Sequence, residues 1–167
     1  AAFNMALACE EQGMMSAEAN MNREHFEFEK SIRLNVANET MKDAQVTVRW
    51  ALRTPDAQIV RSGEESLTVP ALTSVWLDKI LFPEAQLRTN YVSYEMEMDG
   101  EILSEGTVNF SYPKYFAYMD PQLSCKAEGD VITVKAQAYA KSVEIRNEED
   151  NLVLSDNFFD MNAGVKR

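Results

Sequence analysis

The clearest indication of the fold is the sequence VSYEMEMDGEILSEGTVNF, residues 92–110. Its first half alternates between apolar residues at even positions (Val92, Tyr94, Met96, Met98) and polar residues at odd positions (Ser93, Glu95, Glu97, Asp99). A period of two is typical of a strand with one face on a core and the other in water. Asp99-Gly100 then separates this run from a second strand pattern, and this dipeptide is a strong signal for a two-residue hairpin. The stretch therefore predicts an antiparallel hairpin.

The same alternation recurs along the chain. It is found at residues 32–36, 46–52, 131–138 and 142–146. Turn signals separate these runs, including Thr54-Pro55-Asp56-Ala57, in which proline suits the first central position of a type I turn, and Gly129-Asp130. Short strands at such intervals predict an all-β fold of antiparallel sandwiches.

A domain boundary is expected within SYPKYFAYMD, residues 111–120. Two prolines and a cluster of aromatic residues interrupt the strand pattern there. We therefore predict two immunoglobulin-like antiparallel β-sandwich domains in tandem, at residues 1–112 and 113–167. The second has only about half the length of such a domain, so we expect it to lack its last strands. Residues 152–154 are predicted to form a buried strand.

Composition excludes several classes of protein. The chain has 167 residues, of which 46% are hydrophobic, and a formal net charge of −11. Such a charge argues against binding to nucleic acid or to an anionic membrane. No apolar run reaches the roughly 18–20 residues of a membrane span. We expect a soluble protein of the periplasm or cytoplasm of a bacterium, with the compartment unknown. Cys9 and Cys125 are both predicted to be buried thiols in different domains, not a disulfide.

Residues with catalytic or metal-binding potential are few. The single histidine, His25, is expected to be structural or solvated, because no reactive serine motif accompanies it. Glu39 and Glu148 lie in polar turns, where nothing would desolvate a carboxyl to make it a general acid. Asp156, Asn157 and Asp160 could hold calcium, but side chains that stabilise a turn are the commoner use of such residues. We predict no catalytic, metal-binding or cofactor-binding residue, and no cofactor.

Trp76 is the candidate for contact with a carbohydrate. Trp50 alternates with valines and reads as core, whereas Trp76 has apolar neighbours on both sides and could point away from the core. A core or interdomain contact is the expected role, and a sugar platform is the alternative. The segment at residues 12–24 shows no clear pattern and is expected to be a methionine-rich loop.

The segment LVLSDNFFDMNAG, residues 152–164, resembles the C-terminal region of family 2 glycoside hydrolases of the β-mannosidase type. The strand patterns of residues 25–112 and 130–145 are similar to the last two immunoglobulin-like domains of that family. The resemblance implies that Asp156 and Asn157 satisfy turn backbone groups, that Phe158 or Phe159 plugs the sandwich end, and that Gly164 adopts a positive φ. Ala163 departs from the family pattern, which has proline there.

For function, the resemblance implies a non-catalytic accessory region. The catalytic glutamates of the family lie on a (β/α)₈ barrel that this chain does not contain, and the expected partner is that barrel. The parent enzyme would hydrolyse β-mannosides or a related β-glycoside. Two alternatives are a stand-alone carbohydrate-binding protein and an immunoglobulin-like adhesion protein, which a large exposed apolar patch would favour.

Overall fold

The computed structural model describes residues 5–12, 29–149 and 151–166. These residues form thirteen strands and one short 3₁₀ helix. The chain divides into two compact units, residues Ala1–Thr54 with Ile59–Ala117, and residues Pro55–Gln58 with Tyr118–Arg167. Residues 13–28, which include His25 and most of the predicted methionine-rich loop, lie outside the described residues.

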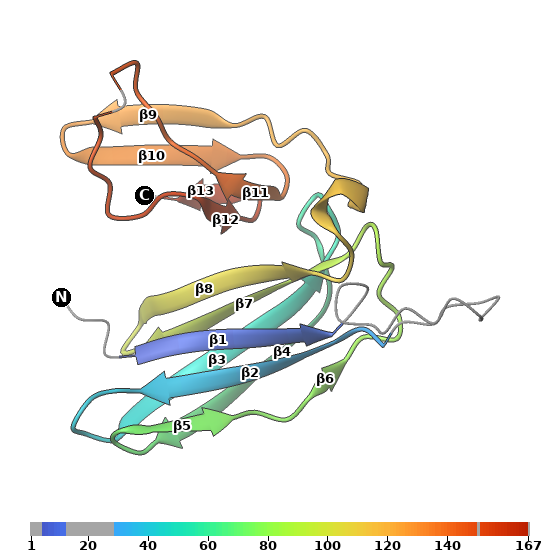
Figure 1. Ribbon diagram of the computed structural model, residues 1–167, viewed down its shortest axis with the longest axis vertical. Coiled ribbons are helices and arrows are strands. Elements are labelled where there is room, and N and C mark those ends of the chain that lie inside the picture. Colours follow the sequence, from blue (N-terminus) through green and yellow to red (C-terminus); the bar gives the residue numbers. More distant parts are fainter. Residues whose placement is uncertain (1–4, 13–28, 150, 167) are drawn as a thin grey trace. The chain divides into compact units, whose positions relative to one another are not determined.

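The first unit contains two antiparallel sheets (Figure 1). One has the order β4-β3-β7-β8, formed by β3 (Ala44–Arg53), β4 (Ile59–Val69), β7 (Tyr91–Met98) and β8 (Glu101–Asn109). The other has the order β1-β2-β5, formed by β1 (Met5–Gln12), β2 (Ser31–Asn38) and β5 (Thr73–Trp76), and β6 (Ile80–Leu81) also pairs with β2. The helix η1 (Pro113–Tyr115) follows β8.

The core of the first unit lies between these sheets. Its fully buried side chains come from alternate positions of the strands in both sheets, and include Ile32, Leu34, Val36, Val46, Val48, Leu52, Val92 and Met96. Phe82 and Phe110 complete the cluster, and Trp50 packs against it with its ring edge-on to Phe82 at 5.4 Å between centroids. The period-two pattern therefore identified the buried face of these strands correctly, and the all-β sandwich prediction is confirmed.

The hairpin predicted at Asp99-Gly100 joins β7 to β8. The φ angles of Asp99 and Gly100 are 53° and 82°. Positive φ at both central residues defines the type I′ turn, whose twist matches that of the paired strands. The register on either side, Met98 opposite Glu101, confirms the hairpin.

Asn38, at the end of β2, ties three segments of the first unit together. Its side chain is buried, and its amide nitrogen donates to the carbonyls of Lys42 (2.9 Å), Val69 (2.9 Å) and Pro70 (3.2 Å). Its amide oxygen accepts hydrogen bonds from the backbone nitrogen and the hydroxyl of Thr40, at 2.9 and 2.7 Å. One side chain thus satisfies the β2–β3 turn and the end of β4.

The second unit is small. A three-stranded antiparallel sheet has the order β13-β10-β9, formed by β9 (Ser124–Glu128), β10 (Val131–Ala136) and β13 (Gly164–Lys166). A separate pair consists of β11 (Ala140–Val143) and β12 (Phe159–Met161). Among the described residues, the core cluster of this unit has as buried members Val134, Ala136, Ala140, Val143 and Met161, with Ile132, Ile145 and Phe159 partly buried against them.

Two predictions for the second unit are wrong. Residues 152–154 form no strand, and Val153 is 97% exposed. Cys125 is exposed, not buried, because every residue of β9 is exposed. The apolar alternation there has no second layer against it among the described residues, so the pattern alone overstated burial. Cys9, in the first unit, is partly buried.

Within the described part of the chain, no helix has the length and apolar character needed to cross a bilayer.

Candidate functional site

Trp76 ends β5 and points away from the core of the first unit. Its neighbour Val75 packs against that core, while Trp76 is 47% exposed. The strand pairing sets Trp76 directly opposite Asn35 of β2. Since paired residues share a face, both belong to the outer face of the β1-β2-β5 sheet.

A cation–π contact holds the indole ring. The guanidinium carbon of Arg33 lies 5.0 Å from the ring centroid of Trp76. Arg33 Nε also donates to the backbone carbonyl of Leu77 at 3.3 Å, and this hydrogen bond holds the guanidinium beside the ring. Such contacts at exposed sites contribute about 0.5–1 kcal/mol and favour one orientation of the ring.

Small and polar side chains share this sheet face with Trp76. The register places Glu10 opposite Arg33, Ala8 opposite Asn35, and Ser74 opposite Ala37. Sequence reasoning identified Trp76 but missed these neighbours. Their alternation with buried residues was visible in the sequence, but only the pairing of β2 with β1 and β5 brings them together.

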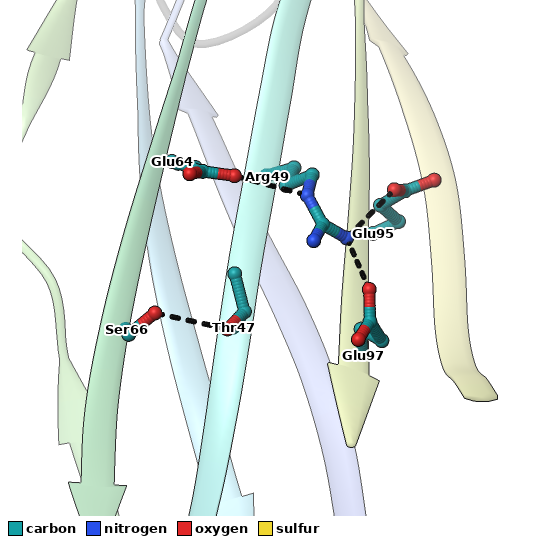
Figure 2. Close-up of polar contacts among 6 residues, drawn as sticks. All are labelled: Thr47, Arg49, Glu64, Ser66, Glu95 and Glu97. Carbon is teal, nitrogen blue, oxygen red and sulfur yellow. Dashed lines mark hydrogen bonds and ion pairs between the residues drawn. The ribbon is translucent and has the colours of Figure 1, made fainter. Parts of the chain in front are cut away.

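The outer face of the other sheet is organised differently (Figure 2). Arg49 of β3 lies between carboxylates of both adjacent strands: its Nε is 3.1 Å from Glu64, and its terminal nitrogen is 2.7 Å from Glu97 and 3.5 Å from Glu95. The pKa of Arg49 is raised above its ordinary value, mainly by the hydrogen bond to Glu97 and to a smaller extent by the one to Glu64.

Hydroxyls on the same face are also paired. Thr47 and Ser66 lie 2.9 Å apart, oxygen to oxygen, and Arg53 donates to the Ser93 hydroxyl at 2.8 Å. This face is therefore a network of satisfied polar groups. It stabilises the sheet by cross-strand pairs and offers few unpaired groups to a ligand.

The two glutamates considered as catalytic acids lie at the surface. Glu39 and Glu148 are both exposed, so burial does not desolvate either carboxyl. Among the described residues, no group of three or more histidine, cysteine, aspartate or glutamate side chains is arranged to hold a metal ion.

The three candidate calcium ligands of the second unit have separate partners. Asn157 accepts a hydrogen bond from the backbone nitrogen of Ile145 at 2.8 Å and donates to its carbonyl at 3.1 Å. Asp160 accepts from the backbone nitrogen of Ser142 at 2.8 Å and from the Lys141 ammonium at 2.9 Å.

Asp156 is 3.2 Å from the ammonium of Lys166. Asn157 and Asp160 therefore bond to residues 12 and 18 positions earlier, and support the irregular β11–β12 pairing and the chain that follows β11.

The adjacent residues Phe158 and Phe159 differ in burial. Phe159 packs against the core cluster of the second unit, whereas Phe158 is 63% exposed and has a φ of 61°. Gly164, at the start of β13, has a φ of 145°, a conformation that favours glycine.

Two family models match this chain. Residues 30–115 match the family model described as a mannosidase Ig/CBM-like domain, and residues 118–167 match one described as an Ig-fold domain. No curated protein sequence matches the chain.

Solved structures resemble this chain to different degrees. A β-D-mannosidase from Dictyoglomus thermophilum aligns with 98% of this chain at a TM-score of 0.72 and 13% identity, and the chain covers 19% of that protein. A β-glucuronidase from Bacteroides uniformis aligns with 87% of this chain at a TM-score of 0.39 and 14% identity, with 16% of that protein covered. The chain thus spans about a fifth or less of the length of these proteins.

The first of these likenesses shows the fold, and the two family models show the relationship. Since the match at residues 30–115 covers just over half of the sequence, the chain belongs to the family of mannosidase Ig/CBM-like domains.

Proposed function

We propose that this chain is a non-catalytic accessory region of a larger glycoside hydrolase. The observation that carries the proposal is the succession of two immunoglobulin-like matches over residues 30–115 and 118–167, together with the alignment of 98% of this chain with a mannosidase structure. A chain that spans 19% of that mannosidase leaves ample room for a separate catalytic domain in a parent protein.

The chemistry of the described residues supports this proposal. Hydrolysis of a glycoside by the usual route needs two carboxyl groups at a defined separation, one of them with a raised pKa. The carboxylates of Glu64, Glu95 and Glu97 lie around Arg49 on an open sheet face, where they form cross-strand ion pairs with its guanidinium. The parent enzyme is proposed to hydrolyse β-mannosides or a related β-glycoside on a (β/α)₈ barrel, against which this region packs.

The domain boundary is proposed to fall near 112–113. The division into compact units lies slightly later, between Ala117 and Tyr118. The backbone nitrogen of Ala117 donates to the Arg88 carbonyl at 2.7 Å, which attaches the segment after η1 to the first unit.

The experiment compares this chain with the natural protein that contains it. The chain alone is expected to leave p-nitrophenyl β-D-mannopyranoside intact. The natural protein is expected to be several times longer, to contain a barrel with paired glutamates, and to release nitrophenol. Turnover by the chain alone, or a natural protein without any barrel, would overturn the proposal.

A further inference from the structure

The two outer faces of the first unit differ in how their polar groups are used. On the β4-β3-β7-β8 sheet, Arg49, Thr47 and Arg53 all bond to side chains of adjacent strands. On the β1-β2-β5 sheet, the side chains of Glu10, Asn35 and Ser74 have no hydrogen-bond or ion-pair partner among the described residues.

We infer that the outer face of the β1-β2-β5 sheet around Trp76 binds a neutral pyranoside, with the indole ring stacked against the sugar. This carbohydrate site goes beyond the proposed accessory role, because it gives the first unit a ligand of its own. It does not depend on which glycoside the parent enzyme cleaves.

The ring is presented in a fixed orientation. Arg33 occupies one side of Trp76, and its Nε bond to the Leu77 carbonyl holds it there. Asn35 of β2 is paired with Trp76. Arg33 lies two residues before Asn35 in β2, and Ala37, which is paired with Ser74, lies two residues after it. The side of the indole away from Arg33 therefore borders small side chains, which leave room for a ligand against the ring.

The sheet face beside Trp76 includes several short side chains. Ala6 and Ala8 of β1 are exposed and are paired with Ala37 and Asn35 of β2. Methyl groups on a sheet face do not rise above the backbone far enough to block a ligand seated beside the taller Trp76. This geometry suits a flat ring of the size of a pyranose better than an inserted side chain, which would need a pocket.

The polar groups complement a sugar rather than an apolar protein surface. A pyranose offers an apolar face of C–H groups and a rim of hydroxyls, each of which both donates and accepts. The terminal nitrogens of Arg33 donate, Glu10 accepts, and Asn35 and Ser74 do both. A protein hot spot of the usual kind would instead be ringed by contacts that exclude water.

The test is titration of the whole 167-residue chain with β-1,4-mannohexaose, cellohexaose and xylohexaose, followed by calorimetry and by tryptophan fluorescence. One stacked ring on an open face is expected to give a dissociation constant on the order of 1 mM for at least one of these probes. Trp76→Ala is expected to weaken that binding at least tenfold, Trp76→Phe to retain most of it, and Asn35→Ala to weaken it about fivefold.

Two controls keep the test decisive. Glu64→Ala changes an exposed residue on the opposite sheet face and is expected to leave binding unchanged. Urea unfolding of each variant checks that the unit remains folded, which is expected since Trp76 is half exposed. The inference is overturned if no probe binds saturably up to 20 mM, or if binding is the same in folded Trp76→Ala as in the unmodified chain.

Discussion

Asn38 is predicted to be the side chain whose amide contributes most to the stability of the first unit. Its five hydrogen bonds join the end of β2, the turn at Thr40–Lys42 and the end of β4 at Val69–Pro70. A hydrogen bond contributes about 1 kcal/mol net, and a buried group left without a partner costs about 1–3 kcal/mol. The bond to the Val69 carbonyl is buried, whereas the Lys42 and Pro70 carbonyls can turn to water.

Asn38→Ala is therefore expected to lower the free energy of unfolding by about 3–5 kcal/mol. Urea unfolding followed by tryptophan fluorescence is the assay, because Trp50 and Trp76 are the only tryptophans and both lie in the first unit. With a slope of about 1.5 kcal/mol/M, the urea midpoint should fall by about 2 M or more. Asn35→Ala is the matched control: this asparagine lies on the outer face of the same strand and should cost less than about 0.5 kcal/mol.

Asn38→Asp separates hydrogen bonding from side-chain size. The substitution places a carboxylate against three carbonyl oxygens, which raises the pKa of the new carboxyl. A raised folded-state pKa means that the folded protein binds the proton more tightly than the unfolded chain. The deficit relative to the unmodified chain should therefore be largest at pH 7 and shrink toward pH 4. A loss below 1 kcal/mol for Asn38→Ala, or no pH dependence of the Asn38→Asp deficit, would show that the Asn38 hydrogen bonds do not stabilise the unit in this way.

Three further predictions concern backbone geometry and ionisation. Gly63→Ala would bring a Cβ within 2.6 Å of Trp50 Cζ2, so it should cost about 1–3 kcal/mol in the same urea assay, and an unchanged midpoint would contradict this contact. Phe158→Asn should raise the stability of the second unit by about 0.5–1 kcal/mol, measured by calorimetry, because asparagine tolerates the φ of 61° better than phenylalanine; a loss would show that the exposed ring packs on something. Burial and the charge of Asp160 raise the pKa of Tyr118, so the second unit should lose stability as pH rises above about 10, where the unfolded tyrosine ionises first. Tyr118→Phe should flatten that slope, and an equally steep slope in this variant would assign it to other groups.

Local patterns in the sequence were enough to predict the strands in which one face is more deeply buried than the other. β2 and β3 each have one face on the core and one that is more exposed, so hydrophobic alternation predicted both the strand and its buried face. β7 follows the same alternation, but Tyr91 and Ser93 on its other face are buried as well. The Asp99-Gly100 turn was equally local, since its φ angles depend on those two residues. β4 was missed because most of its residues are exposed and its sequence lacks alternation; it is a strand because β3 pairs with it.

The candidate site was only partly visible. Trp76 could be recognised as an aromatic residue among apolar neighbours, but its exposure depends on Val75 being the residue that packs inward. Arg33 and Asn35 lie some 40 positions earlier in the sequence, and no local rule connects them to Trp76. That connection requires the register between β2 and β5.

Local sequence patterns were enough to predict the all-β class, the hairpin turns and the buried face of the alternating strands, because these depend on neighbours one to three residues apart. Which apolar runs are covered by a second layer depends on how distant strands pack. The tertiary structure buries Val46 and Val48 between two sheets and leaves Cys125 and Val153 exposed, although both groups are apolar in sequence. Burial is a property of what packs on the opposite side, and that partner is chosen by long-range strand pairing that no short pattern encodes.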